Sequence, residues 1–126
     1  MYARRYAQAQ NETASPERLT VLLFGAAVRH MRAAAAALES GRPDHAQEPL
    51  SKALDIVAHL DATFDRDRLP ELADNLGAVY RFTCQRLLSG TATRSARPVR
   101  EAERVFAPLA DAFAKAVEQL PAGGPR

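Results

Sequence analysis

The apolar residues between positions 15 and 40 recur at helical spacing and form two stripes along one predicted helix. Ser15, Pro16 and Glu17 give this helix a capped start, and Gly41 ends it. The first stripe consists of Leu19, Leu22, Leu23, Ala26, His30, Ala33 and Ala37, and the second of Val21, Phe24, Val28, Met31 and Ala35. A helix with two apolar faces must be covered on both sides. It is therefore the central helix of a bundle, or one face waits for a partner.

Three further stretches show an apolar face at helical spacing and predict three more helices. Asp44 could start the second helix, but the well-formed helix is expected to begin near Glu48 after a looser turn, because Pro49 lacks the amide proton that a helix interior uses. The third begins at Pro70, carries Leu88 on its apolar face and stops at Gly90, a residue typical of helix ends. The fourth begins near residue 97 and continues to residue 120 with a proline inside it.

The connections between these helices are short, which predicts antiparallel neighbours. Residues 91–97 are expected to form a basic loop of small residues between the third and fourth helices. No stretch alternates in the way a β-strand would. The sequence therefore predicts an all-α protein, a mostly antiparallel four-helix bundle with a flexible N-terminal arm.

The two ends of the chain lack the helical spacing. Residues 1–14 are polar and are expected to form the flexible arm, residues 15–120 the bundle domain and residues 121–126 a disordered tail. The arm carries Tyr2 and Tyr6, whose rings could dock in an apolar groove of this chain or of another molecule.

Composition indicates a soluble protein with one domain. The 126 residues suit a single core, and a net charge of +2 is too near balance to argue for nucleic-acid binding. Cys84 is the single cysteine and has no partner for an internal disulfide, which indicates a reducing compartment. The uninterrupted apolar runs fall short of the roughly 18 residues that span a bilayer, and the first residues do not resemble a secretory signal. We expect a cytoplasmic protein without membrane insertion.

Candidate chemistry is sparse. His30, His45 and His59 do not have the spacing that places two ligands on one helical face, and Cys84 has no histidine near it in sequence. We therefore expect no metal site, no cofactor and no enzyme activity. The arginines at positions 94, 97 and 100 could meet an acidic partner or nucleic acid, but no aromatic platform accompanies them.

Short motifs occur in order between residues 6 and 117. They are Tyr6, Thr13-Ala14-Ser15-Pro16, Leu22-Leu23-Phe24, Thr63-Phe64-Asp65, Asn75-Leu76, Val79-Tyr80-Arg81-Phe82, and Ala107-Pro108-Leu109 followed by Phe113. This series resembles the family of flagellar secretion chaperones that bind flagellin, the FliS type. In that resemblance Phe24 stands where the family has a tyrosine, and Gly25-Ala26 stands where it has Asp-Gly.

The resemblance implies a cytoplasmic export chaperone with a four-helix fold. Such a chaperone binds the C-terminal segment of flagellin, prevents premature polymerisation and delivers the subunit to a gate component of the flagellar type III export apparatus. An amphipathic segment laid in an apolar groove is a recurrent form of recognition. The expected partner-binding residues are Tyr6, Val21, Phe24, Val28, Met31, Leu54, Val57, Val79 and Tyr80, and some of them must instead be core.

Two other functions stay open from the sequence. The chain could be a helical adaptor for a different secreted or regulatory client, or a small nucleic-acid-binding bundle that uses the arginines near residue 97. A homodimer also stays open, since an uncovered apolar face can be masked by self-association.

Overall fold

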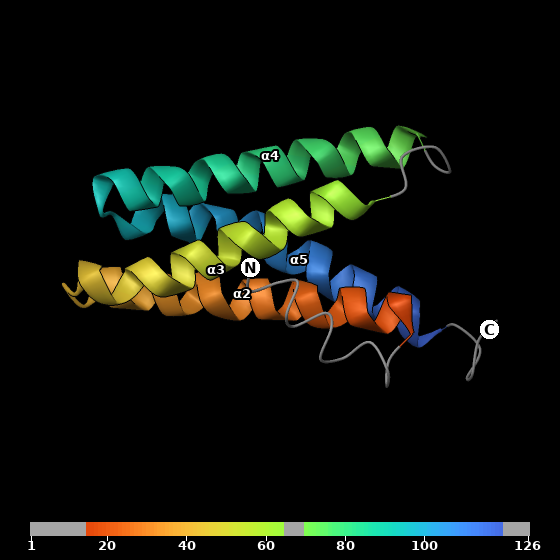
Figure 1. The fold of residues 1–126 in the computed structure, drawn as a ribbon, viewed down its shortest axis with the longest axis horizontal. Coiled ribbons are helices and arrows are strands. Elements are labelled where there is room, and N and C mark those ends of the chain that lie inside the picture. The colour runs from red at the N-terminus through yellow and green to blue at the C-terminus, as the bar shows by residue number, and fades with distance from the viewer. Residues whose placement is uncertain (1–14, 65–69, 120–126) are drawn as a thin grey trace.

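The structure, a computed structural model, describes residues 15–64 and 70–119 and consists there of four long helices (Figure 1). The helices are α2 (Pro16–Glu39), α3 (Pro43–Thr63), α4 (Pro70–Thr93) and α5 (Ala96–Glu118). Consecutive helices run in opposite directions, and each helix contacts two others, so that the four form a closed ring in the order α2, α3, α4, α5. The predicted antiparallel four-helix bundle is confirmed.

Several predictions concern residues outside the described ranges. They are the N-terminal arm with Tyr2 and Tyr6, the short connection at residues 65–69 before the third helix, residue 120 at the end of the fourth helix, and the tail. The proposed boundaries of arm, bundle domain and tail therefore stay predictions.

The ends of α2 follow the sequence prediction. The Ser15 hydroxyl accepts a hydrogen bond from the Arg18 amide at 3.2 Å, and Pro16 occupies the first turn, where its missing amide proton costs nothing. At the other end Gly41 has a φ of +74°, and the Arg42 amide donates to the Ala37 carbonyl at 2.8 Å. A left-handed glycine is the usual way to close a helix and turn the chain.

The predicted start of α3 is wrong. The helix begins at Pro43, and Pro49 lies inside it. An internal proline removes one backbone hydrogen bond and costs about 3 kcal/mol. Ala46, Leu50 and Ala53 are all buried in the core, so the apolar contact of this first part of the helix outweighs the missing bond.

The predicted end of α4 at Gly90 is also wrong. The helix continues to Thr93, and the expected loop at residues 91–97 shrinks to Arg94 and Ser95, with Ser95 capping α5. Arg94, at a φ of +55°, takes the left-handed position that a glycine usually fills. Gly90 serves packing instead, because a Cβ built on it would lie 2.5 Å from Cγ2 of Val99 on α5. The glycine lets the two helices approach closely.

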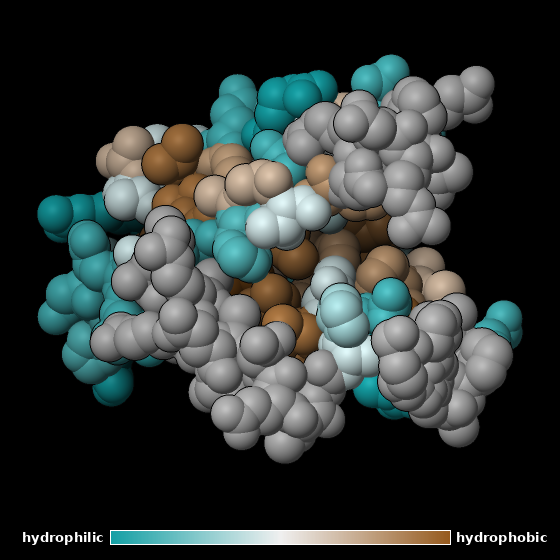
Figure 2. Space-filling view, turned by 45° about the vertical axis from the view of Figure 1, so that its right-hand side comes forward, coloured by the Kyte–Doolittle hydropathy of each residue, from teal (hydrophilic) through white to brown (hydrophobic). Residues whose placement is uncertain are grey.

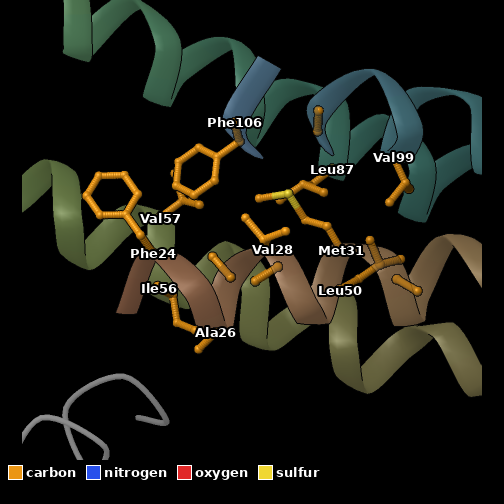
Figure 3. Close-up of a cluster of buried hydrophobic side chains, with 14 of the residues drawn as sticks. Phe24, Ala26, Val28, Met31, Leu50, Ile56, Val57, Leu87, Val99 and Phe106 are labelled. Atoms are coloured by element: carbon orange, nitrogen blue, oxygen red, sulfur yellow. The ribbon is translucent and has the colours of Figure 1, made fainter. Parts of the chain in front are cut away.

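An aromatic cluster forms the centre of the core. The Phe24 ring lies 5.3 Å, between centroids, from Phe106 and also from Phe113, and Tyr80 lies 6.4 Å from Phe106. Figure 3 shows Phe24 and Phe106 pointing toward each other from α2 and α5, with Met31 and Leu87 further along the bundle. The cluster joins three of the four helices. Leu88, which the apolar face of α4 was expected to bury, is 57% exposed.

Thr83 is a polar side chain in this core. It is fully buried, and its hydroxyl oxygen has no hydrogen-bond partner. Valine has nearly the same shape without the hydroxyl, so Thr83→Val should raise the free energy of unfolding by about 1 kcal/mol. The measurement is urea denaturation followed by circular dichroism. Thr91→Val is the control, because the Thr91 hydroxyl donates to the Leu87 carbonyl at 3.1 Å; equal gains in both variants would contradict the prediction.

Candidate partner-binding surface

The structure divides the predicted partner-binding residues into core and surface. Five are buried in the core: Phe24, Val28, Met31, Val57 and Tyr80. The second apolar stripe of α2 is thus covered by the chain's own helices, and a partner could touch these five side chains only if the bundle opened. Contact between these five residues and a partner stays a prediction. Their burial does not favour it.

The other predicted residues lie nearer the surface. Val21, Leu54 and Val79 are partly buried and retain exposed area on α2, α3 and α4 respectively. Tyr6 lies outside the described residues. Of the predicted set, these three side chains are therefore the described ones that a partner can reach without unfolding the bundle.

An exposed apolar surface runs along the boundary between α4 and α5. Phe82 and Val105 are each 39% exposed, and exposed apolar side chains are informative where they adjoin one another in a patch. Val79 and Leu109 are partly buried and pack against the core. We call these four residues the α4–α5 strip.

The register of the two helices brings these residues together. The Arg86 guanidinium lies 3.0 Å from the Glu101 carboxylate across the boundary. In an antiparallel pair, one turn back along α4 corresponds to one turn forward along α5, so Phe82 lies opposite Val105. The ring contact between Tyr80 and Phe106 has the same register. The next turn places Val79 beside Leu109, and the strip is continuous.

The strip is electrically neutral. At one end Glu101 accepts from Arg86 and lies 3.7 Å from Arg97, and the hydrogen bond from Arg86 holds the pKa of Glu101 below its usual range. The exposed positions one turn from the strip are uncharged: Ala78, Gln85, Pro108 and Ala112. An apolar partner would meet these uncharged positions, with the exposed Arg104 beside Val105 as a cation at the edge of the strip.

Phe82 and Val105 were missed as site residues in the sequence. Both lie off the main apolar stripes of their helices, and Phe82 stands out in the sequence only as part of the Val79-Tyr80-Arg81-Phe82 motif. The useful signal is an apolar residue outside the main stripe. Where a stripe already fills one face of a helix, an aromatic residue beside it is not needed to form the core. Which of these outlying apolar residues lie side by side depends on the register of the two helices.

A second apolar area lies on another face of the bundle. Figure 2 shows apolar side chains gathered in a recess at mid-height, below α4, which is uppermost as in Figure 1. Helical spacing places Leu54 on the edge of α3 nearest α4, and α3 and α4 have the smallest contact of the four neighbouring helix pairs. Leu54 therefore retains its place among the predicted contact residues.

The arginines expected in a free basic loop are largely engaged within the bundle. Arg100 lies 2.8 Å from both Glu39 and Glu103, and Glu103 also accepts from Arg32 at 2.8 Å. The Arg100 hydrogen bond lowers the pKa of Glu39. Burial raises the pKa of Glu103, but its hydrogen bonds from Arg32 and Arg100 prevail and lower it. These pairs join α2 to α5. Of the three arginines expected for nucleic-acid binding, Arg94 is the freest.

Burial shifts the pKa values of two uncharged side chains of the bundle, Cys84 and His30. Burial raises the pKa of the Cys84 thiol, and the nearby Asp61 charge adds to the effect, so the nucleophilic thiolate is disfavoured. Burial lowers the pKa of His30, with further contributions from Lys52 and Arg29 that outweigh the opposing charge of Glu48. Within residues 15–64 and 70–119, histidine, cysteine and acidic side chains do not cluster in threes that could hold a metal ion.

By length and overall hydropathy α2 would be able to cross a membrane, although its uninterrupted apolar runs are short. The run-length argument from the sequence was therefore too strict. Buried core helices pass the same test, and eight α2 residues are core. The feature is weak evidence for a membrane helix.

Comparison with known proteins extends the fold and motif observations. The family model described as Flagellar protein FliS matches residues 1–120. A Bacillus subtilis (strain 168) protein named flagellar secretion chaperone FliS is 29% identical over 113 residues, which cover 90% of this chain and 84% of that protein. A protein of the same name from Salmonella typhimurium (strain LT2) is 32% identical over 115 residues, which cover 87% of this chain and 85% of that protein.

The fold is shared with a solved structure as well. A crystal structure described as a flagellar chaperone from bacteria superposes with a TM-score of 0.74 and 22% identity, and the match covers 91% of this chain and 94% of that chain. The family match spans the arm motif with Tyr6 and all four helices. The resemblance noted in the sequence is therefore confirmed, and the chain belongs to the FliS family of flagellar secretion chaperones.

Proposed function

We propose that this protein is a cytoplasmic export chaperone for flagellin. It binds the C-terminal segment of flagellin on the bundle surface, prevents premature polymerisation and delivers the subunit to a gate component of the flagellar type III export apparatus. The observation that carries the proposal is the α4–α5 strip, an exposed and neutral apolar surface on a member of this family.

The chemistry of the strip supports a helical client segment. An amphipathic helix has one apolar face, and the groove between two antiparallel helices accepts such a face along its length. The client's own polar face then stays in water. Ordering a disordered segment costs free energy, so the client has to bury a large area, and the partly exposed Val21 and Leu54 offer further contact beyond the strip.

The first test is calorimetry with a synthetic peptide of roughly 40 residues from the C-terminus of the same organism's flagellin, long enough to bury the area that coupled folding requires. We expect one-to-one binding, a negative heat-capacity change and a gain of helix by circular dichroism. No heat at roughly 100 μM would reject flagellin as the client. The chain would then be a helical adaptor for a different client.

The strip itself is tested with Phe82→Ala. Truncating an aromatic anchor at the centre of an interface should weaken peptide binding at least about tenfold. Leu88→Ala is the matched control, because Leu88 is 57% exposed on α4 itself and is not one of the four strip residues; its effect should stay within about threefold. Equal losses in the two variants would remove the strip from the site. Thermal melts of both variants verify that each is folded.

Self-association would compete for the same neutral surface. Size-exclusion chromatography with light scattering, with and without the peptide, tests this alternative. If the free protein is a dimer that the peptide converts into a one-to-one complex, the strip is shared between the two functions.

A further inference from the structure

A pocket of about 220 Å³ opens between α2 and α5, on a different side of α5 from the strip. Its floor is formed by small residues, Gly25 of α2 with Ala107 and Ala110 of α5. Arg29 and Asp111 stand on its rim, one on each helix. A hollow of this size is large enough for one apolar side chain and remains open to solvent.

Gly25 is not required by the fold. Its φ lies outside the left-handed region, and a Cβ built on it would meet only the flexible end of Arg29, at 3.4 Å. Glycine is among the least favourable residues in a helix interior. At position 90, by contrast, a glycine is needed, because Val99 occupies the space that a side chain would take. The missing side chain at position 25 therefore leaves space that, among the described residues, only the end of the Arg29 side chain approaches.

The rim of the pocket has opposite charges on its two sides. Arg32 is already paired with Glu103 at 2.8 Å. Arg29 and Asp111, in contrast, have no ion pair within the described ranges, so one cation on α2 and one anion on α5 face the opening. Such a rim complements an acidic group on the α2 side and a basic group on the α5 side.

We propose that this pocket is a second docking point for the client segment of the proposed function, on which the inference rests. It receives one apolar side chain of a helical part of the segment. An acidic residue of the client lies toward Arg29 and a basic residue toward Asp111. The two charges set the direction in which this part of the client lies, because the reversed helix would place like charges together.

The test uses the flagellin peptide, in calorimetry, against the wild-type protein and three variants. Gly25→Leu fills the pocket, and Arg29→Glu reverses one rim charge without touching the core. Each should weaken binding about tenfold or more, and the loss from Arg29→Glu should shrink at high salt. Arg94→Glu makes the same charge change in the α4–α5 turn and should alter binding less than about threefold. Gly25→Leu should not lower the melting temperature.

The outcomes separate the two proposals. Wild-type binding that Gly25→Leu and Arg29→Glu leave unchanged would overturn the pocket while the flagellin assignment stands. If the wild-type protein does not bind the peptide, the flagellin assignment is rejected. The proposal that flagellin occupies the pocket is then rejected as well. If Gly25→Leu does not fold, Arg29→Glu decides alone, since it lies on the exposed surface.

Discussion

Phe24→Ala is expected to lower the free energy of unfolding by about 3 to 5 kcal/mol, a large part of the stability of a domain of this size. Phe24 is 3% exposed and lies between Phe106 and Phe113, each 5.3 Å away. Its removal leaves a cavity in the aromatic cluster that joins α2, α4 and α5. The measurement is urea denaturation monitored by circular dichroism.

Phe82→Ala is the control for Phe24→Ala, because it makes the same chemical change at a side chain that is 39% exposed. It should cost about 1 to 2 kcal/mol, since part of the ring already lies in water. Equal losses at the two positions would contradict the assignment of Phe24 to the core. The comparison also bears on function: weak peptide binding by Phe24→Ala would report loss of the fold, whereas weak binding by Phe82→Ala would report loss of a contact.

Gly90→Ala is expected to destabilise the bundle by about 1 to 3 kcal/mol, although alanine favours a helix over glycine by about 1 kcal/mol. The added Cβ would lie 2.5 Å from Cγ2 of Val99, so α4 and α5 would have to move apart. Thermal and urea denaturation measure the loss. Gly25→Ala is the control, because its Cβ has room and the helix preference alone should then raise stability.

A double-mutant cycle identifies the cause. Val99→Ala removes the methyl group that the new Cβ would meet, so the loss in Gly90→Ala with Val99→Ala should be smaller than the sum of the single losses by about 0.5 to 3 kcal/mol. Additive losses would mean that the cost at Gly90 does not come from Val99. A stabilised Gly90→Ala single variant would reject the close approach of the helices altogether.

The helices and their antiparallel order could be predicted from the sequence because they depend on local signals. Apolar residues at helical spacing, the Ser15 cap and the left-handed Gly41 all act within a few residues of chain. The predictions failed where a local signal met a tertiary contact. Pro49 was expected in the first turn of the second helix, but that helix already begins at Pro43, where burial of its residues outweighs the missing bond. Gly90 was expected at a helix end but serves helix packing.

The candidate site was less predictable than the fold. Val79 was expected in it, and the α4–α5 strip includes Val79. Phe24 and Met31 were named as client contacts, and the structure buries both in the core. A helix with two apolar stripes does not reveal which one its own chain covers. The motif series from Tyr6 to Phe113 named the family, since it depends on residue types in order and needs no geometry.

The sequence by itself therefore determined the helical periodicity, the turn at Gly41 and the family of this protein. The tertiary structure decided which apolar residues are left in water. Phe82 meets Val105 only because the register of two antiparallel helices places them opposite each other, and Gly25 opens a pocket only because the residues facing it on α5 are small. Periodicity is a property of one helix, whereas exposure depends on which neighbour covers each face, and that is decided when the helices pack.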